Sequence, residues 1–255
     1  MFIQVYSMFT LCIPTIDRFD NFLSKYLPHY LNNPLVLEII ITDENGNDAK
    51  KIQNAFPNSH KIKVVVNDHR LGPFLNKMKA CSLARNEWIV LMDSDNFAHD
   101  NYFSIAADYI NSNIKDQKNV ILAPCFASPN FNYSHLSGFI YEKGKFQTNR
   151  LQEKTLLTSQ YTCSETLMNT GNYVVNKFFV DNLDLTKEVN NIKYSSACDV
   201  IYFNTLLFEQ LDLKMHVVPG LVYDHVVHGG SVYLQTHTEF RQFNEYVYQR
   251  YGNLQ

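Results

Sequence analysis

Four short apolar runs alternate with helix-like segments in the first hundred residues, and this alternation limits the possible folds more than any other feature. The apolar runs are Met8–Thr15, Leu35–Thr42, Ile62–Val66 and Trp88–Met92. Apolar side chains recur at helical spacing over the segments between them, which are residues 17–31, 48–56 and 74–85. Because strands joined by right-handed helical crossovers lie parallel, the sequence predicts an α/β fold with a mostly parallel central sheet flanked by helices.

The second half of the chain has a weaker pattern. It predicts helices over residues 102–114, 196–211 and 239–251, strands over 120–126, 215–218 and 221–222, and a strand or helix start within 167–179. Residues 127–165 are polar, aromatic and rich in turn formers, which predicts a substrate-facing insertion or a hairpin around residues 142–144. Because no clear linker interrupts the sequence, we expect one domain, residues 1–255, with halves at about 1–125 and 126–255.

Two aspartates end the fourth apolar run. Asp93 and Asp95 follow Trp88–Met92 directly and are separated only by Ser94. The carboxyl ends of parallel strands form the edge at which open α/β sheets bind ligands. Carboxylates spaced in this way can ligate a hard divalent cation, which in turn can hold a diphosphate. A strand that ends in a turn with solvated aspartates explains the same residues equally well.

Charge and composition argue against several classes of function. The net charge is −3 and the pI about 6.3, so the chain lacks a basic field for nucleic acid or an anionic membrane. No GxGxxG motif follows the first strand and no P-loop motif occurs, which disfavours ordinary dinucleotide and P-loop sites. No apolar stretch reaches the length of a membrane span. Five scattered cysteines without a CxxC pair favour a reducing, cytoplasmic compartment.

Several of these residues occur in the order seen in GT-A glycosyltransferases. They are Pro14-Thr15 and Asp43 at strand ends, Arg70 after the third strand, the helix that runs from Asn76 to Ala84-Arg85-Asn86, and the strand that ends in Asp93-Ser94-Asp95. The chain therefore resembles GT-A enzymes, and glycosyltransferase family 2 in particular, well over about residues 8–100 and loosely beyond them. Asn86 stands where the family usually has glycine, and asparagine tolerates the same positive φ.

The resemblance implies a GT-A fold and transfer of a sugar from a nucleoside diphosphate sugar, with UDP as the default nucleotide, to a hydroxyl acceptor such as a glycan. It also implies Mn²⁺ or Mg²⁺ as cofactor, with Asp93 touching the ribose or the metal and Asp95 on the metal. The donor contacts that it implies are Pro14, Thr15, Asp43, Arg70, Asn76, Asp93 and Ser94. For Asp43 and Arg70, a turn residue and a solvent-facing loop residue are the alternatives.

Transfer to a hydroxyl group requires a general base, and Asp199 is our candidate for an inverting displacement. The alternative is a capping box, Ser196-Ala-Cys-Asp199, that begins the predicted helix 196–211, and both roles are compatible because a helix that begins at the cleft is a good place for a base. The family has a glutamate–aspartate pair near this helix, whereas this chain has Cys198-Asp199. Glu165 is the reserve candidate.

Two histidines, His225 and His228, follow a short apolar strand and precede Gly229-Gly230-Ser231. A neutral imidazole can complete a manganese site, and the glycines allow backbone N–H groups to approach a phosphate. We expect His228 to be the metal ligand because it adjoins the glycines, with a hydrogen-bonded core histidine as the alternative. Zinc is disfavoured, since no further ligands stand at zinc-site spacing.

Three other functions fit parts of the sequence. A phosphatase of the haloacid dehalogenase type also places Asp-x-Asp after an apolar strand, but usually after the first one. A sugar-1-phosphate nucleotidyltransferase needs a glycine-rich basic loop where this chain has Thr15-Ile-Asp-Arg18. A non-catalytic sugar-binding or scaffold domain is the third. The apolar face of the predicted helix 239–251 packs into the core by default, with a homodimer contact or peripheral membrane contact as alternatives.

Overall fold

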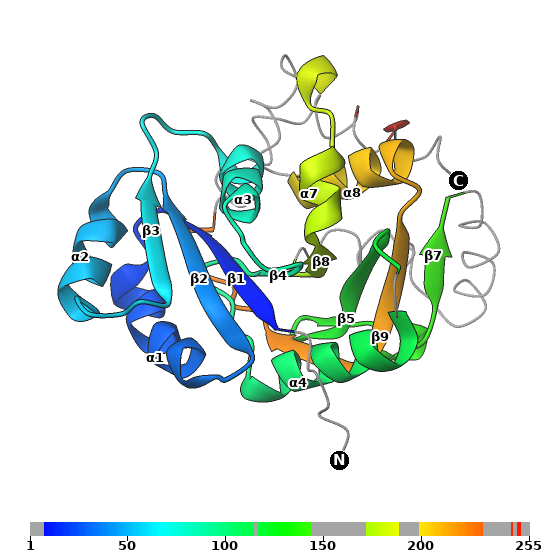
Figure 1. Cartoon of the computed structure of the whole chain (residues 1–255), viewed down its shortest axis with the longest axis horizontal. Helices are drawn as coiled ribbons and strands as arrows, with labels where there is room; N and C mark the ends of the chain where they lie inside the picture. The colour runs from blue at the N-terminus through cyan, green and yellow to red at the C-terminus, as the bar shows by residue number, and fades with distance from the viewer. Residues whose placement is uncertain are drawn as a thin grey trace.

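A computed structural model describes residues 8–114, 117–143, 172–188 and 199–231, together with Tyr246, Gln249 and Arg250. Within these residues nine strands form one sheet in the order β3-β2-β1-β4-β8-β5-β9-β7, and β6 pairs with β5. Helices lie on both faces of this sheet (Figure 1). Most of the paired residues belong to parallel strand pairs, so the predicted α/β fold is confirmed.

The first half of the chain forms the parallel part of the sheet. Its strands are β1 (Phe9–Thr15), β2 (Val36–Asp43), β3 (Ile62–Val66) and β4 (Trp88–Leu91). They are connected through the π-helical turn η1 (Phe19–Leu23) with α1 (Ser24–Asn32), through α2 (Asn47–Ala55), and through α3 (Pro73–Ser82). Thr15 pairs with Asp43 and Cys12 pairs with Leu91. The carboxyl ends of β1, β2 and β4 therefore meet at one edge of the sheet.

The second half continues the sheet through strands that run in both directions. Its elements are α4 (Asp100–Tyr109), η2 (Ile110–Ile114), β5 (Val120–Ser128), β6 (Phe131–Asn132), η3 (Ser134–Leu136), β7 (Ile140–Glu142), β8 (Val174–Asn176), α7 (Lys177–Asn182), η4 (Thr186–Glu188), α8 (Asp199–Gln210) and β9 (Lys214–Asp224). The short strand β8 lies antiparallel between β4 and β5 and so joins the two halves. Apart from Tyr246, Gln249 and Arg250, the predicted helix 239–251 lies outside the described residues.

One strand differs from its prediction. Two short strands were expected on either side of Pro219-Gly220, whereas β9 runs without interruption over Lys214–Asp224. Its pairing with β5 shifts register beside these two residues, and Gly220 has a φ of +76°. Pro219-Gly220 therefore forms a bulge within one strand, because glycine adopts the positive φ that the bulge requires.

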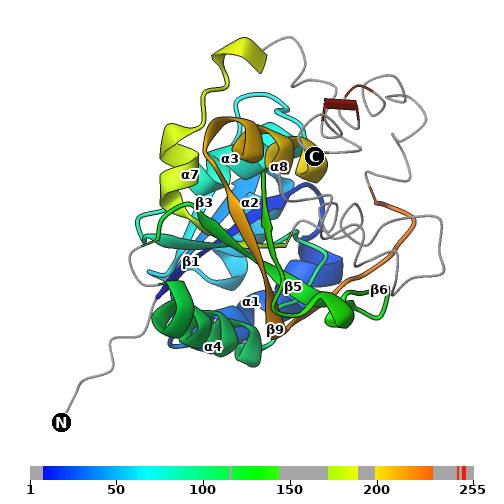
Figure 2. The same cartoon turned by 90° about the vertical axis from the view of Figure 1, so that its right-hand side faces the viewer.

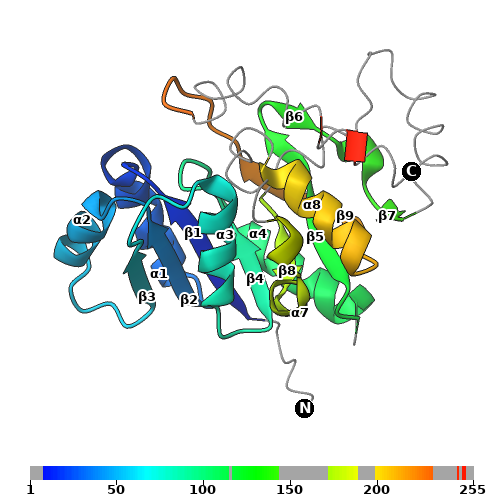
Figure 3. The same cartoon turned by 90° about the horizontal axis from the view of Figure 1, so that it is seen from above.

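The sheet divides the core into two layers, and helices cover each of them. Cys12 of β1 points into the layer under α3, α7 and α8, whereas its neighbours Leu11 and Ile13 point into the layer with α1 and α4. Figure 2 shows α4 beneath the sheet and α3 with α8 above it. Seen from above, α3, α7 and α8 lie across the same face (Figure 3). No helix among the described residues is long and apolar enough to cross a bilayer.

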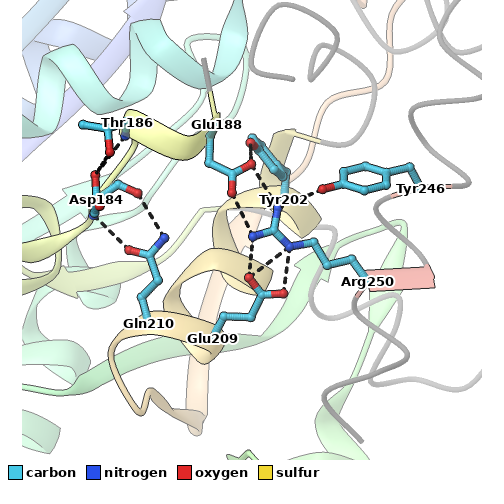
Figure 4. Close-up of polar contacts among 8 residues, drawn as sticks. All are labelled: Asp184, Thr186, Glu188, Tyr202, Glu209, Gln210, Tyr246 and Arg250. Atoms are coloured by element: carbon cyan, nitrogen blue, oxygen red, sulfur yellow. Dashed lines mark hydrogen bonds and ion pairs between the residues drawn. The ribbon is translucent and has the colours of Figure 1, made fainter. Parts of the chain in front are cut away.

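Arg250 connects the end of the chain to α8 and η4 (Figure 4). Its guanidinium donates to Glu188 Oε1 at 2.8 Å and to Glu209 Oε1 at 2.7 Å. Glu188 also accepts a hydrogen bond from the hydroxyl of Tyr202 at 2.5 Å, and its side chain is only 6% exposed. Nearby, Gln210 exchanges two hydrogen bonds with the backbone of Asp184. These contacts fix the side chain of Arg250 on α8 and pair its charge with the nearly buried carboxylate of Glu188.

We expect Arg250→Met to lower the free energy of unfolding by about 3 kcal/mol, because it leaves the buried Glu188 carboxylate without its guanidinium. Thermal denaturation followed by circular dichroism would show a fall in Tm of about 6 to 12 °C. Lys177→Met is the control, since it breaks a pair in which Asp181 is 53% exposed, and such pairs contribute about 0.5 kcal/mol or less. Equal effects of the two substitutions would contradict this role of Arg250.

Candidate active site

The Asp93-Ser94-Asp95 turn lies at the carboxyl end of β4, beside the end of β1. The N–H of Met92 donates to the carbonyl of Cys12 at 3.0 Å, which carries the parallel pairing past β4. The side chains of Asp93 and Asp95 are 30% and 21% exposed, while Ser94 is buried. Both aspartates therefore lie at the edge of the sheet where parallel strands end, with carboxylates that solvent can reach.

Hydrogen bonds from distant segments fix this turn. The N–H of Asp93 donates to Oδ1 of Asn172, the residue preceding Tyr173 and β8, at 2.6 Å. Asn96 Oδ1 accepts from the N–H of Val226 at 3.0 Å. Next to it, Phe97 and Asp224 exchange backbone hydrogen bonds of 3.0 and 2.8 Å. The chain that leaves β9 is thereby held beside the aspartate turn.

This arrangement places His228 against Asp95. His228 Nε2 lies 2.8 Å from Asp95 Oδ2, and the N–H of Gly230 donates to His228 Nδ1 at 3.2 Å. The guanidinium of Arg18 donates to the carbonyl of Gly230 at 2.6 Å, and its Nε lies 3.9 Å from the same oxygen of Asp95. The ring of Phe22 lies 5.1 Å from that of His228. The β1–η1 loop and the His228–Gly230 segment therefore meet over Asp95.

The other aspartate faces a different partner. Lys77 Nζ of α3 lies 2.9 Å from Asp93 Oδ1 and 2.6 Å from Asp199 Oδ2. Lys77 and Asp199 are 12% and 14% exposed at their side chains. Asp199 is the first residue of α8, so this lysine links α3, the aspartate turn and α8. The structure therefore brings Asp199 to the same edge as Asp93, through a cation that the sequence analysis did not single out.

The pKa values in this group reflect burial and opposite charges. Burial opposes the charged form of Lys77, but the carboxylates of Asp199 and Asp93 prevail and raise the pKa of Lys77 above its ordinary value. Burial raises the pKa of Asp199, the charge of Lys77 opposes this rise, and the charge of Asp93 adds to it. Lys77 therefore stays protonated, and Asp199 binds a proton more readily than an exposed aspartate does.

Two of the expected donor-binding residues are engaged in local hydrogen bonds. Asp43 is buried at the end of β2, where it accepts from the N–H groups of Asn45 at 3.2 Å and Ala49 at 2.9 Å. Thr15 donates its hydroxyl hydrogen to Asp48 at 2.5 Å. Asp48, which the sequence analysis did not single out, also accepts from the N–H of Arg18 at 2.9 Å. Asp48 thereby shapes the β1–η1 loop that presents Arg18.

The remaining expected donor contacts differ in exposure. Asn76 is buried, donates to the carbonyl of Thr42 at 3.1 Å and accepts from Asn67 at 3.0 Å. Pro14 is buried within β1, and Arg70 is exposed in the loop after β3. Of these three residues, only Arg70 is exposed, and contact of any of them with a donor stays a prediction.

The two histidines lie in different surroundings. His225 Nδ1 lies 2.9 Å from Asn130 Nδ2, and burial lowers the pKa of His225. His228, in contrast, contacts Asp95. The reserve base Glu165 lies outside the described residues.

A sequence signal for Lys77 existed, but none existed for Arg18. Lys77 shares one face of α3 with Phe74 and Cys81, which are both buried. A lysine among apolar residues on a buried helix face requires a partner of opposite charge, and its periodicity is visible in the sequence. Arg18 lies in a loop, where no periodicity indicates the direction of a side chain.

Two neighbouring side chains at this edge are candidate metal ligands. Asp95 and His228 offer an oxygen and a nitrogen ligand at hydrogen-bonding distance from each other. Over the residues that the structure describes, no three His, Cys, Asp or Glu side chains form a ready-made metal site. A cation held here would therefore need further ligands from a bound substrate or water, which is how Mg²⁺ sites at phosphates are commonly completed.

Comparisons with solved structures agree with the fold. TarS of S. aureus (residues 1–349, in complex with UDP-GlcNAc) is 15% identical with a TM-score of 0.61, covering 95% of this chain and 66% of that one. GalNAc-T7 with UDP, GalNAc and Mn²⁺ is 12% identical with a TM-score of 0.61, covering 96% and 50%. A longer TarS structure is 15% identical with a TM-score of 0.59. The match covers 94% of this chain but only 39% of that protein.

Sequence comparison identifies the family. No curated protein sequence matches the chain. The family profile described as "Glycosyl transferase family 2" matches residues 10–171, which is more than half of the 255 residues. The matched segment includes all of β1 to β4 except Phe9, the aspartate turn and Lys77. The predicted resemblance is confirmed, and this chain belongs to glycosyl transferase family 2.

Proposed function

We propose that this protein transfers a sugar from a nucleoside diphosphate sugar to a hydroxyl group of an acceptor, with UDP as the first nucleotide to test and a glycan as the acceptor class. The observation that carries the proposal is the meeting of Asp93, Asp95, His228 and Asp199 at one edge of the sheet. Family membership supports the reaction class. The UDP-GlcNAc complex of TarS and the UDP complex of GalNAc-T7 support the choice of UDP.

The residues at this edge suit a divalent cation. Asp95 and His228 would hold Mn²⁺ or Mg²⁺, with the diphosphate as the third source of ligands. When bound, the cation supplies positive charge that neutralises the leaving diphosphate. The GalNAc-T7 structure with Mn²⁺ supports this choice of metal.

The chain's own residues have separate roles in the proposed displacement. Arg18 lies next to Asp95 and adds a guanidinium that can donate to a phosphate oxygen. Asp93 orients the donor near its ribose. Asp199 accepts the proton of the acceptor hydroxyl while the acceptor oxygen forms a bond to the anomeric carbon and the bond to the diphosphate breaks. Attack from the face opposite the diphosphate inverts the anomeric carbon, so we propose an inverting reaction.

A nucleotide-release assay tests the proposal. Purified protein is incubated with UDP-GlcNAc and other UDP-sugars, with Mn²⁺, and with a panel of glycan acceptors, and release of UDP is measured. Acceptor-dependent release that requires Mn²⁺ supports transfer. Release of inorganic phosphate from a phosphate monoester would instead support a phosphatase. Stabilisation by UDP-sugars without turnover would support a sugar-binding scaffold.

A further inference from the structure

Lys77 is a charged residue on the apolar face of α3. Phe74 and Cys81, one turn before it and one turn after it, are both buried. The lysine stem borders a small pocket with apolar walls formed by Phe74, Met78, Leu91 and Phe203. The same pocket is lined by Asp199, and the ammonium group at the end of the stem pairs with the carboxylates of Asp199 and Asp93.

Those two carboxylates belong to opposite halves of the proposed reaction. Asp93 follows β4, on the side of the donor nucleotide, whereas Asp199 begins α8, on the side of the acceptor. Lys77 Nζ reaches Asp93 Oδ1 at 2.9 Å and Asp199 Oδ2 at 2.6 Å. Two carboxylates this close repel each other, and a shared ammonium group removes that repulsion.

We propose that Lys77 is a positioning residue that holds the Asp199 carboxylate in register with the donor-side carboxylate of Asp93, a role that rests on the function proposed above. Its two ion-pair partners in the described structure are Asp93 and Asp199, and it pairs with neither the proposed metal ligand Asp95 nor its neighbours His228 and Arg18. Loss of Lys77 therefore affects the placement of the base more than the binding of the donor phosphates.

Kinetics of Lys77→Met and Lys77→Arg, with Lys79→Met of the same helix as a charge-matched control, test this role. We expect Lys77→Met to lower kcat by about 100-fold, since a base misplaced by about 1 Å costs that much. The KM for the UDP-sugar and the shift in Tm caused by UDP with Mn²⁺ are expected to stay close to their wild-type values. Lys77→Arg, which retains the charge, is expected to recover at least a tenth of the wild-type kcat. Lys79→Met is expected to behave as wild type.

Each outcome supports or contradicts the positioning role of Lys77. A kcat for Lys77→Met equal to that of wild type, or a loss of donor affinity in proportion to the loss of kcat, would overturn the positioning role alone. If Lys77→Met does not fold, kcat and KM are measured for Lys77→Gln, which keeps a hydrogen-bond donor. A fall in kcat with an unchanged KM for the UDP-sugar is again the expected result. A wild-type protein that turns over no donor would overturn the proposed function and this inference together.

Discussion

Asp95→Asn is expected to reduce acceptor-dependent release of UDP by about 100- to 1,000-fold at saturating donor. The amide keeps the size of the side chain but removes the charge on the oxygen that faces His228 at 2.8 Å. Without that charge, a neutral imidazole and substrate oxygens are left to hold the cation, and leaving-group charge is neutralised less well. We also expect the stabilisation of the protein by UDP to lose its dependence on Mn²⁺, measured as the shift in Tm with and without the metal.

Asp181→Asn is the matched control for this variant. It removes one negative charge from an exposed side chain of α7 that pairs with Lys177 of the same helix. Activity and the Mn²⁺-dependent shift in Tm are expected to stay at wild-type levels. A metal-dependent shift that persists in Asp95→Asn at wild-type size would place the cation elsewhere.

The parallel half of the fold was predictable because its pattern is local. A buried strand between two helical layers is apolar along its whole length, and each crossover helix carries its own periodicity. The strands β1 to β4 consequently match their predicted ranges to within one residue at each end. Because these strands are parallel, their carboxyl ends share one edge of the sheet, which placed Asp93 at the same edge as the end of β1.

The second half of the sheet, in which parallel and antiparallel pairs are mixed, was less predictable because its pairing is not local. β8 is only three residues long. It lies between β4 and β5 in the sheet, although it follows β5, β6 and β7 in the chain. Nothing in Val174–Asn176 alone indicates two partner strands. The prediction of two strands in place of β9 was wrong for a related reason. Pro219-Gly220 indicates a turn in the sequence, but the structure accommodates it as a bulge within one paired strand.

The candidate site likewise has a part that local sequence predicts and a part that depends on non-local contacts. The strand-end aspartates could be found because the apolar run stops at them. The contact between Asp95 and His228 joins residues 133 positions apart, and the contact between Lys77 and Asp199 joins residues 122 positions apart. Such pairs depend on the tertiary fold, which places the chain after β9 against the turn after β4. The sequence indicated Asp95, His228 and Asp199 as separate candidates, and the periodicity of α3 indicates that Lys77 is buried, but neither contact could be read from these signals.

Local chemistry also changes how two expected donor contacts are understood. Asp43 already accepts two backbone N–H hydrogen bonds, and Asn76 already joins α3 to β2. These bonds fix the backbone at the strand ends whether or not a nucleotide is present. Contact of either residue with a donor stays a prediction, and it would have to use atoms left over from this structural role.

Asp199→Asn is expected to lower kcat for transfer by about 100- to 10,000-fold, because the amide cannot accept the acceptor proton. The substitution keeps the shape of the side chain and leaves Asp93 as the charged partner of Lys77. Donor binding is therefore expected to persist, with the affinity for UDP in the presence of Mn²⁺ within about threefold of wild type, measured by isothermal titration calorimetry. This separation of turnover from donor affinity distinguishes a base from a metal ligand, since Asp95→Asn is expected to lose both.

The reserve candidate supplies the decisive comparison for the base. Glu165→Gln is made in parallel, and both variants are assayed with the same donor and acceptor. If Asp199 is the base, Glu165→Gln retains wild-type kcat and Asp199→Asn does not. The reverse result would assign proton transfer to Glu165 and leave Asp199 as the carboxylate that begins α8, where a negative charge stabilises the helix N-terminus and pairs with Lys77.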